Sequence, residues 1–325
     1  MASDKLFSYG SANVDSLLTT TKSIIAEAKD FLNDAIFSRT TLLSWLNEKG
    51  RVNYSQGGAS ILQPLLYGKN STFKAYSKDD VLDTTGQEGI TTAQFPWRNM
   101  GGTIVIFGDE LRMNAGSGKI KDLLKAKIMQ AMMSGRDALS IDIFASTQAA
   151  KKVSALPVLV DASATVGDIN SSTNSWWQAI VTASGSFAAR GQADMRDGRD
   201  QVLNAGQKGG PSIDFIVTTR LIYELYEASL VQGIRYESRK EGDATFERLK
   251  WSTAMLDHDP NVATGEMYML ASEALDFYVH SDANWQVGDF KEPVNQDTKV
   301  AKVIWMGNLC TGNRRRLVKL TGITA

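Results

Sequence analysis

The stretch GSGKIKDLLKAKIMQAMMSGRDALSIDIFAST, residues Gly116 to Thr147, carries the longest helical pattern of the chain. Apolar residues recur in it at three- and four-residue steps, which is the spacing of one helix face. They are Ile120, Leu123, Leu124, Ile128, Ala131, Met132, Gly135, Ala138 and Leu139. Ser117 suits an N-cap, and at 1.5 Å per residue a helix over 119–145 would span roughly 40 Å. The pattern predicts a strut that crosses a whole domain.

Gly135 lies on this apolar face. Glycine costs about 1 kcal/mol relative to alanine inside a helix, so its presence there calls for a reason. We expect it to permit either a bend in the helix or a close packing partner.

An amphipathic helix is predicted far upstream, over Val14 to Phe37. Its apolar face includes Leu17, Ile24, Phe31 and Leu32. Such an arm packs either on its own domain or on a partner, and the pattern leaves both open. Leu42, Leu43, Trp45 and Leu46 extend the apolar surface as far as Gly50.

The segment between the arm and the strut, Tyr67 to Ile106, has a sequence pattern typical of β-strands and turns. Ser71–Tyr76 and Ile90–Trp97 are predicted strands, and Gly102–Phe107 is a third, rich in β-branched residues. Residues 77–89 are charged and turn-rich, which favours a long hairpin whose tip leaves the core. Because an isolated two-stranded ribbon is marginal in water, such a hairpin needs a neighbouring surface; a solvated loop is the alternative.

The second half of the chain mixes strands and helices, which makes the fold class α+β. A crossing or strand is predicted first, at Val153–Val160, and then a polar link at 162–175 that marks a subdomain boundary. Further predicted helices are Ser175–Ala189, Asp194–Ala205 and Arg220–Val231. Predicted strands are Ile213–Thr218, several between Leu249 and His280, Lys299–Leu309 and Arg316–Ile323.

Composition excludes several classes of protein. The chain has 325 residues, more than one core usually holds, so two subdomains are expected. Lys and Arg total 35 against 36 Asp and Glu, so no overall field attracts nucleic acid or a membrane surface. The single Cys310 excludes an internal disulfide or CxxC site. With no signal-like start and no run of eighteen apolar residues, we expect a soluble protein in a reducing compartment.

No motif carries enzyme chemistry. GSGK at 116–119 is not a phosphate-binding loop, because Met113 and Ile120 occupy positions where that motif needs Gly and Ser or Thr. The sequence around His258, DHDP, indicates a turn, since three adjacent side chains cannot all face one ion. His280 and Cys310 are expected to be structural. We therefore predict no catalytic, cofactor-binding or metal-binding residues.

Two further clusters have more than one interpretation. Arg314, Arg315 and Arg316 form the only dense basic cluster. It is either a solvated turn with one internal pair or a contact to phosphate or to carboxylates of a neighbouring subunit, and we favour a structural or interface role. Trp176 and Trp177 are predicted to be core residues, since no basic side chains alternate with them.

Four phrases carry a resemblance to a known family. They are GGASILQPLLY (57–67), WRNMGGTIVIFGDELRMNAG (97–116), DFIVTTRLIYELYEASL (214–230) and GNLCTGNRRRLVKLTGI (307–323). With the order of the predicted elements, they resemble the major capsid proteins of tailed bacteriophages, which share the Hong Kong 97 phage fold. The likeness extends over nearly the whole chain.

This resemblance implies a division of the chain into the parts of a capsid subunit. It implies an N-arm (1–50), a short lead into the P domain (51–66), an E-loop hairpin (67–106), a P domain with the spine helix (107–157), an A domain (158–248), P-domain return strands (249–287), and C-terminal strands of both domains (288–325).

The resemblance also implies a function, namely self-assembly into hexamers and pentamers of an icosahedral head around double-stranded DNA. Implied partners are further copies of the chain, separate scaffolding, portal or decoration proteins, and DNA bound without sequence specificity. No membrane is implied, and the location would be the virion, assembled in the bacterial cytoplasm. Rival readings are an encapsulin-like compartment that encloses cargo enzymes and a soluble α+β enzyme of unknown type.

On this reading the functional residues are those at contacts between subunits. We expect them to be Leu17, Ile24, Phe31, Leu32, Phe73, Tyr76, Phe95, Trp97, Arg314 and Arg315. Gly135 would be the bend by which one sequence fits several lattice positions. Lys69, Lys74 and Lys78 lie where some family members form crosslinks between subunits, but with no acceptor Asn identified we expect none here.

Overall fold

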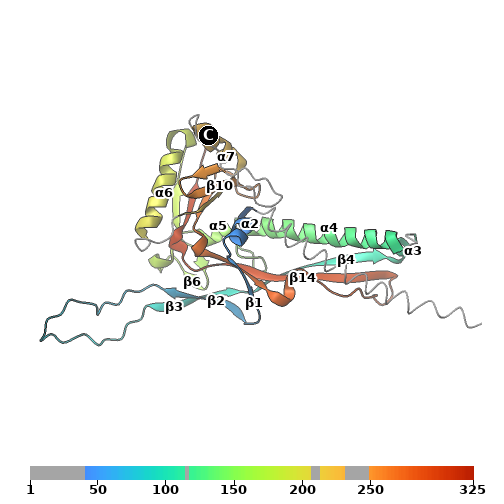
Figure 1. Ribbon diagram of the computed structural model, residues 1–325, viewed down its shortest axis with the longest axis horizontal. Helices are drawn as coiled ribbons and strands as arrows, with labels where there is room; N and C mark the ends of the chain where they lie inside the picture. The colour runs from blue at the N-terminus through green and yellow to red at the C-terminus, as the bar shows by residue number, and fades with distance from the viewer. Residues whose placement is uncertain (1–40, 114–116, 206–212, 231–248) are drawn as a thin grey trace, which may run out of the picture.

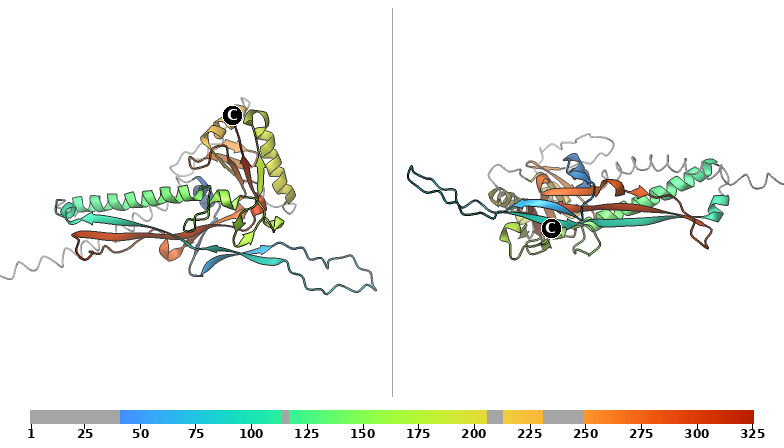
Figure 2. Two further views of the ribbon diagram at one scale, coloured as in Figure 1. Left: turned by 180° about the vertical axis from the view of Figure 1, so that it is seen from behind. Right: turned by 90° about the horizontal axis from the view of Figure 1, so that it is seen from below.

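The computed structural model describes residues 41–113, 117–205, 213–230 and 249–325. Its shape is elongated: a long helix lies above a pair of long strands, a mixed α/β body stands at one end, and a thin ribbon projects from the base (Figure 1). In both of the other views the long helix extends to one side of the α/β body and the ribbon to the opposite side (Figure 2). None of the described helices is both long and apolar enough to cross a membrane.

The elements follow one another in an order that mixes both classes. The α-helices are α2 (Thr41–Glu48), α3 (Gly108–Met113), α4 (Ser117–Ile143), α5 (Leu156–Leu159), α6 (Gln192–Ala205) and α7 (Arg220–Ser229). The strands are β1 (Val52–Ser55), β2 (Ser60–Leu66), β3 (Ile90–Pro96), β4 (Arg98–Phe107), β5 (Thr165–Val166), β6 (Ile169–Asn170), β7 (Ile180–Ala183), β8 (Phe215–Thr218), β9 (Leu249–Trp251), β10 (Ala254–His258), β11 (Met267–Leu270), β12 (Leu275–His280), β13 (Gln286–Val287), β14 (Thr298–Thr311) and β15 (Leu317–Thr321).

The helix predicted from the opening stretch is confirmed as α4, 27 residues long. Its apolar face is buried at Leu124, Ile128, Met132 and Leu139 and continues to Ile143. These positions follow steps of four and seven, so one stripe of the helix covers the sheet below. The helix begins at Ser117 itself, and the residue before it lies outside the described part of the chain.

Gly135 serves as a close packing position. A Cβ placed there would overlap the six-membered ring of Trp285, which therefore lies directly against the helix backbone. Trp285 in turn packs on Trp305 of β14, with ring centroids 6.1 Å apart. The glycine thus lets α4 approach the tryptophan pair on the sheet, and its role as a bend between lattice positions stays a prediction.

Gly135→Ala is expected to destabilise the subunit even though alanine is the better helix former. Overpacking typically costs about 1–3 kcal/mol, whereas the propensity gain is about 1 kcal/mol. Urea unfolding of the variant and of Ser134→Ala, a substitution at an exposed position on the same helix, measures the difference. Equal stability of Gly135→Ala and the wild type would show that Trp285 moves aside freely.

The sheet under α4 is built on the long strand β14. Its first ten residues pair antiparallel with β4, from Thr298 opposite Phe107 to Gly307 opposite Arg98. Its last five pair with β12, and the order of strands is β1-β12-β14-β13 with β4 also on β14. The predicted strand Gly102–Phe107 is confirmed and begins four residues earlier.

The α/β body contains a six-stranded sheet in the order β7-β15-β11-β8-β10-β9. Strand β8 leads into α7, which confirms the predicted strand within Ile213–Thr218 and the predicted helix that starts at Arg220. All four residues of β8 and all four of β11 are buried, as expected for central strands covered on both faces. Helix α6 packs on β15 and β7.

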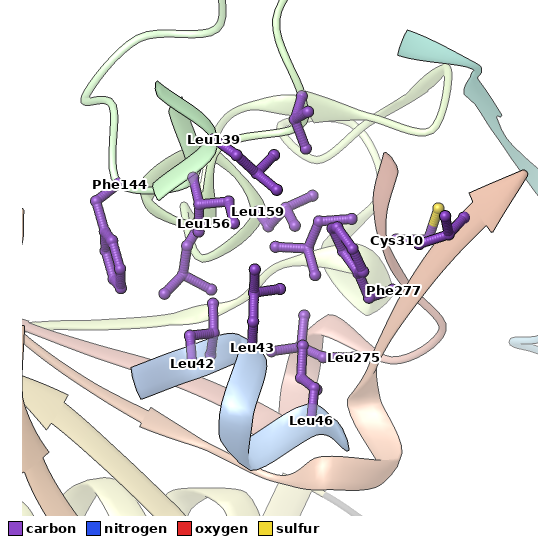
Figure 3. Packing of buried hydrophobic residues seen from close by; sticks show 14 of the residues in the cluster. Leu42, Leu43, Leu46, Leu139, Phe144, Leu156, Leu159, Leu275, Phe277 and Cys310 are labelled. Atoms are coloured by element: carbon purple, nitrogen blue, oxygen red, sulfur yellow. The ribbon is translucent and has the colours of Figure 1, made fainter. Parts of the chain in front are cut away.

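Helix α2 lies between the long sheet built on β14 and the six-stranded sheet, and it contacts β12 of the first and β8 of the second. Leu42, Leu43 and Leu46 enter the large core together with residues of α4, α5 and β12 (Figure 3). On the other side, the Trp45 ring stacks on Phe215 of β8 with centroids 4.7 Å apart. This apolar segment, expected to extend the arm, is thus an internal part of the fold.

The projecting ribbon differs from the predicted hairpin in one strand. Ser71–Tyr76 forms no strand; the partner of β3 is β2, paired from Ser60 opposite Pro96 to Leu66 opposite Ile90. The alternation of SILQPLL was the missed signal, since its burial runs in period two. Pro64 fits there because a two-stranded ribbon has only edge strands.

Two other local predictions are wrong. Ser175–Ala189, predicted as a helix, contains a 3-10 turn, strand β7 and the start of a π-helix. Strand β7 forms there because it pairs in parallel with β15, a contact 138 residues away in sequence at Ile180 and Val318. Within Val153–Val160 the chain forms the short helix α5, with Pro157 in its first turn.

Candidate assembly surfaces

The projecting ribbon, residues 60–96, concentrates large apolar side chains that are exposed within the described part of the chain. Phe73 is 92 % exposed, the highest value among the large apolar side chains described, and Tyr76 is also exposed. Others on the ribbon are Leu62, Leu66, Tyr67, Val81, Leu82 and Ile90. Together with Phe73 and Tyr76 they make up half of the large exposed apolar residues in the described part of the chain. Exposed apolar clusters of this kind mark interaction sites.

The loop at the ribbon tip is held together by polar turns. Asn70 accepts from the backbone and hydroxyl of Thr72, and Asp83 does the same for Thr85. These hydrogen bonds lower the pKa of Asp83. The Ser71 hydroxyl donates to Gln87 Oε1 across the loop at 2.9 Å. The tip is therefore shaped by local hydrogen bonds, which leaves its large apolar residues free to point outward.

The base of the ribbon is internal, which corrects one predicted interface residue. Phe95 is only 2 % exposed and belongs to the main core, because β3 turns that face toward the body. Trp97 is half-buried; its indole N–H donates to Gly58 O at 3.1 Å, and its ring meets His280 edge-on. Trp97 thus contacts residues at the base of the ribbon and on the body, and its part in subunit contacts remains a prediction.

The arginine cluster divides into three different environments. Arg314, predicted to lie at a subunit interface, is fully buried and donates to Leu159 O at 2.8 Å, so that prediction is wrong. Arg316 pairs with Glu273 at 3.0 Å. Arg315 is exposed beside a polar hollow of about 510 Å³ that Gln178, Gln201 and Asn204 also line. Of the three, Arg315 keeps the predicted access to a neighbour.

The remaining predicted interface residues are on the arm. Leu17, Ile24, Phe31 and Leu32 lie outside the described residues, as does the predicted helix that carries them.

Side chains with reactive groups have structural surroundings. Burial is the main cause that raises the pKa of the Cys310 thiol well above its usual range, which keeps it from being a thiolate nucleophile. Burial raises the pKa of Asp259, and its carboxylate accepts a hydrogen bond from Asn261 N in a turn. His258 lies against the Tyr223 ring at 5.1 Å. The described residues contain no group of three metal-ligating side chains.

The far end of the long sheet carries a second exposed apolar group that the sequence patterns did not single out. Phe107, the last residue of β4, and Val294, in the connection from β13 to β14, are exposed there. Gly108 N donates to Asp297 O at 2.8 Å, which joins the end of β4 to that connection. Lys127 of α4 pairs with Glu110 and lies 5.9 Å over the Phe107 ring. Exposed apolar side chains thus lie at both ends of the molecule.

Comparisons with known proteins find relatives by structure alone. Neither a family model nor a curated protein matches the chain. Among solved structures, the capsid of cyanophage A-1(L) matches with a TM-score of 0.61 and 14% identity, covering 85% of this chain and 91% of that chain. The capsid of a native GTA particle matches with a TM-score of 0.58 and 9% identity, covering 86% and 90%. A structure of Mycobacterium phage Adephagia matches with a TM-score of 0.53 and 13% identity, covering 86% and 90%.

These matches define the class of fold. Each covers at least 85% of this chain and at least 90% of the matched chain. The chain has the capsid fold of tailed bacteriophages, the Hong Kong 97 phage fold, and the α+β class predicted from sequence is confirmed.

Proposed function

We propose that this chain is a major capsid protein, which assembles into hexamers and pentamers of an icosahedral head around double-stranded DNA. The observation that carries the proposal is the ribbon. The ribbon projects away from the body (Figure 2), and none of the described residues covers its exposed apolar side chains, led by Phe73 and Tyr76. Full burial of a side chain of this size stabilises by about 1.5–3 kcal/mol, and a closed lattice repeats each contact many times.

The proposal assigns a role to each part of the molecule. The ribbon around β2 and β3 is the E-loop, with residues 60–96 in place of the sequence-based 67–106. Helix α4 and the sheet of β4, β12 and β14 form the P domain, and the six-stranded sheet forms most of the A domain. The arm before residue 41 supplies a further contact to neighbours through Leu17, Ile24, Phe31 and Leu32.

The proposed partners follow from the same role. Other copies of the chain are the principal ones, and separate scaffolding, portal or decoration proteins complete the head. The DNA is packed without sequence specificity, in keeping with a formal net charge of −1. The protein has no catalytic task in this scheme, and its location is the virion, assembled in the bacterial cytoplasm.

Sedimentation and negative-stain microscopy of the full-length protein test the proposal. We expect fast-sedimenting particles with five- and six-fold capsomers, and particles isolated from their natural source should hold nuclease-protected DNA. A protein that stays monomeric at every concentration tested would contradict shell formation. Particles filled with a second protein and free of DNA would instead identify a cargo compartment.

A further inference from the structure

Arg314 is an unusual residue to find fully buried, and its donors are all directed at one loop. The Nε donates to Leu159 O at 2.8 Å, the Nη1 to Ala164 O at 3.4 Å and to the Ser171 hydroxyl, and the Nη2 to Val158 O at 3.4 Å and to Asp161 O. Five acceptors thus match the five N–H groups of a guanidinium. Burial lowers the pKa of Arg314 to about 10, which leaves it charged at neutral pH.

We call the segment around Arg314, residues 158–178, the bracket. Further contacts within it add to those of Arg314. The Asp161 carboxylate accepts from the backbone N–H groups of Ser163 and Ala164, at 2.6 and 3.0 Å. The Trp177 indole N–H donates to Val166 O at 3.0 Å, and Arg314 lies 5.8 Å over the Trp177 ring. Charge, hydrogen bonds and aromatic packing therefore fix one conformation of the bracket.

The outer side of the bracket touches the ribbon. Gly167 O accepts from Gln94 N of β3 at 3.1 Å. Gly167 has φ +61°, and a Cβ on it would lie 2.7 Å from the Ala93 Cβ, so the loop meets the strand backbone closely. Further out, the Trp176 ring stacks on Tyr67 with centroids 4.6 Å apart.

The contacts of Gly167 lie at the level of Gln63, because Ala93 pairs with Gln63, whereas the stack of Trp176 on Tyr67 lies further toward the tip than the attachment of the ribbon to the long sheet. That attachment consists of Asn308 Nδ2 to Pro96 O at 2.9 Å and Gln63 Nε2 to the Tyr278 hydroxyl at 3.1 Å. Tyr67 lies four residues beyond Gln63, toward the tip. Just before the ribbon begins at β2, Gly57 and Gly58 both have positive φ, at +75° and +91°, a conformation that glycine adopts at low cost. The ribbon is thus attached at its base and steadied further out by the bracket.

We propose that Arg314 is a positioning residue for assembly: by holding the bracket in one conformation, it sets the direction in which the ribbon leaves the subunit. It does so without touching a neighbouring subunit. This inference rests on the proposed function, because direction matters only if the ribbon reaches a neighbour.

Spin labels test the direction of the ribbon within the free subunit. Glu88→Cys on the exposed end of the ribbon and Ile141→Cys on the exposed side of α4 form the label pair, and the single native Cys310 is buried. We expect one narrow distance distribution in the full-length protein below its assembly concentration. Arg314→Lys keeps the charge but loses the planar five-donor geometry, so the distribution should become at least twofold wider and the yield of closed shells should fall about tenfold.

A second variant and a control keep the test decisive. Gly167→Ala leaves Arg314 intact but separates the bracket from Ala93, so it should reproduce the wider distribution, and it decides the matter if Arg314→Lys does not fold. Arg316→Met loses only the pair with Glu273 and should match the wild type in both measurements. Wild-type distances and shell yields in both Arg314→Lys and Gly167→Ala would overturn the proposal. Wider distributions in a protein whose wild type forms no shells would uphold the positioning role and refute the proposed function.

Discussion

Removal of Lys69–Glu88, which joins Gly68 directly to Gly89, is expected to abolish shell formation while the subunit keeps its stability. The joint is feasible because Tyr67 N and Gly68 N both donate to Gly89 O, at 2.9 and 3.2 Å. The removed side chains are exposed, apart from the partly buried Thr72, and lie outside both hydrophobic clusters. The melting temperature should therefore change by no more than a few degrees, whereas light scattering should detect no particles.

The place of this truncation matters. A larger deletion that extended to Gly102 would remove β3 and half of β4, including Phe95 and the pairing with β14, and would unfold the subunit. Phe73→Ser combined with Tyr76→Ser gives a milder version, and Leu221→Ser on α7 is the matched change of an exposed apolar residue outside the ribbon. Normal shells from the truncated protein would show that the ribbon has no part in assembly.

Trp45→Ala should cost about 3–5 kcal/mol in the free energy of unfolding, the usual range for a buried tryptophan. Its ring is 1 % exposed and stacks on Phe215, so the change opens a cavity between α2 and the six-stranded sheet. A loss of this size is a large part of the 5–15 kcal/mol that stabilises a typical domain. Chemical denaturation followed by circular dichroism measures it.

Trp45→Phe is the matched control. Phenylalanine keeps the stacking on Phe215 and removes an indole N–H that has no hydrogen-bond partner among the described residues. The cost should then be below about 1.5 kcal/mol. A similar loss for both variants would mean that volume at Trp45, rather than the ring contact, decides the stability.

Elements with a regular apolar period could be predicted from the sequence. The stripe from Leu124 to Leu139 predicted α4, and the short buried runs predicted β8, β11 and β12, because burial on one face imposes its period on the residues. Ser175–Ala189 was predicted as a helix since its composition suits one. Pairing of β7 with the distant β15 overrode that local preference, and no local pattern reports such a pairing.

The assembly surface was predictable only in part, for a related reason. Phe73 and Tyr76 could be proposed as contact residues because they adjoin the charged, turn-rich residues 77–89, which predicted a hairpin whose tip leaves the core. Phe95 lies on a strand of the same predicted hairpin, but the face of a strand that is buried depends on its partner, and β2 had not been recognised. Arg314 and Arg315 are adjacent and chemically identical, so only the fold separates the buried one from the exposed one.

The arrangement of the ribbon in an assembled particle tests the central claim most directly. A cryo-electron microscopy map of particles formed by the full-length chain should show capsomers in which each ribbon, from Leu62 to Ile90, lies on an adjacent subunit with Phe73 and Tyr76 buried in the contact. A map in which the ribbons fold back on their own subunits, or contact no neighbour, would contradict the account.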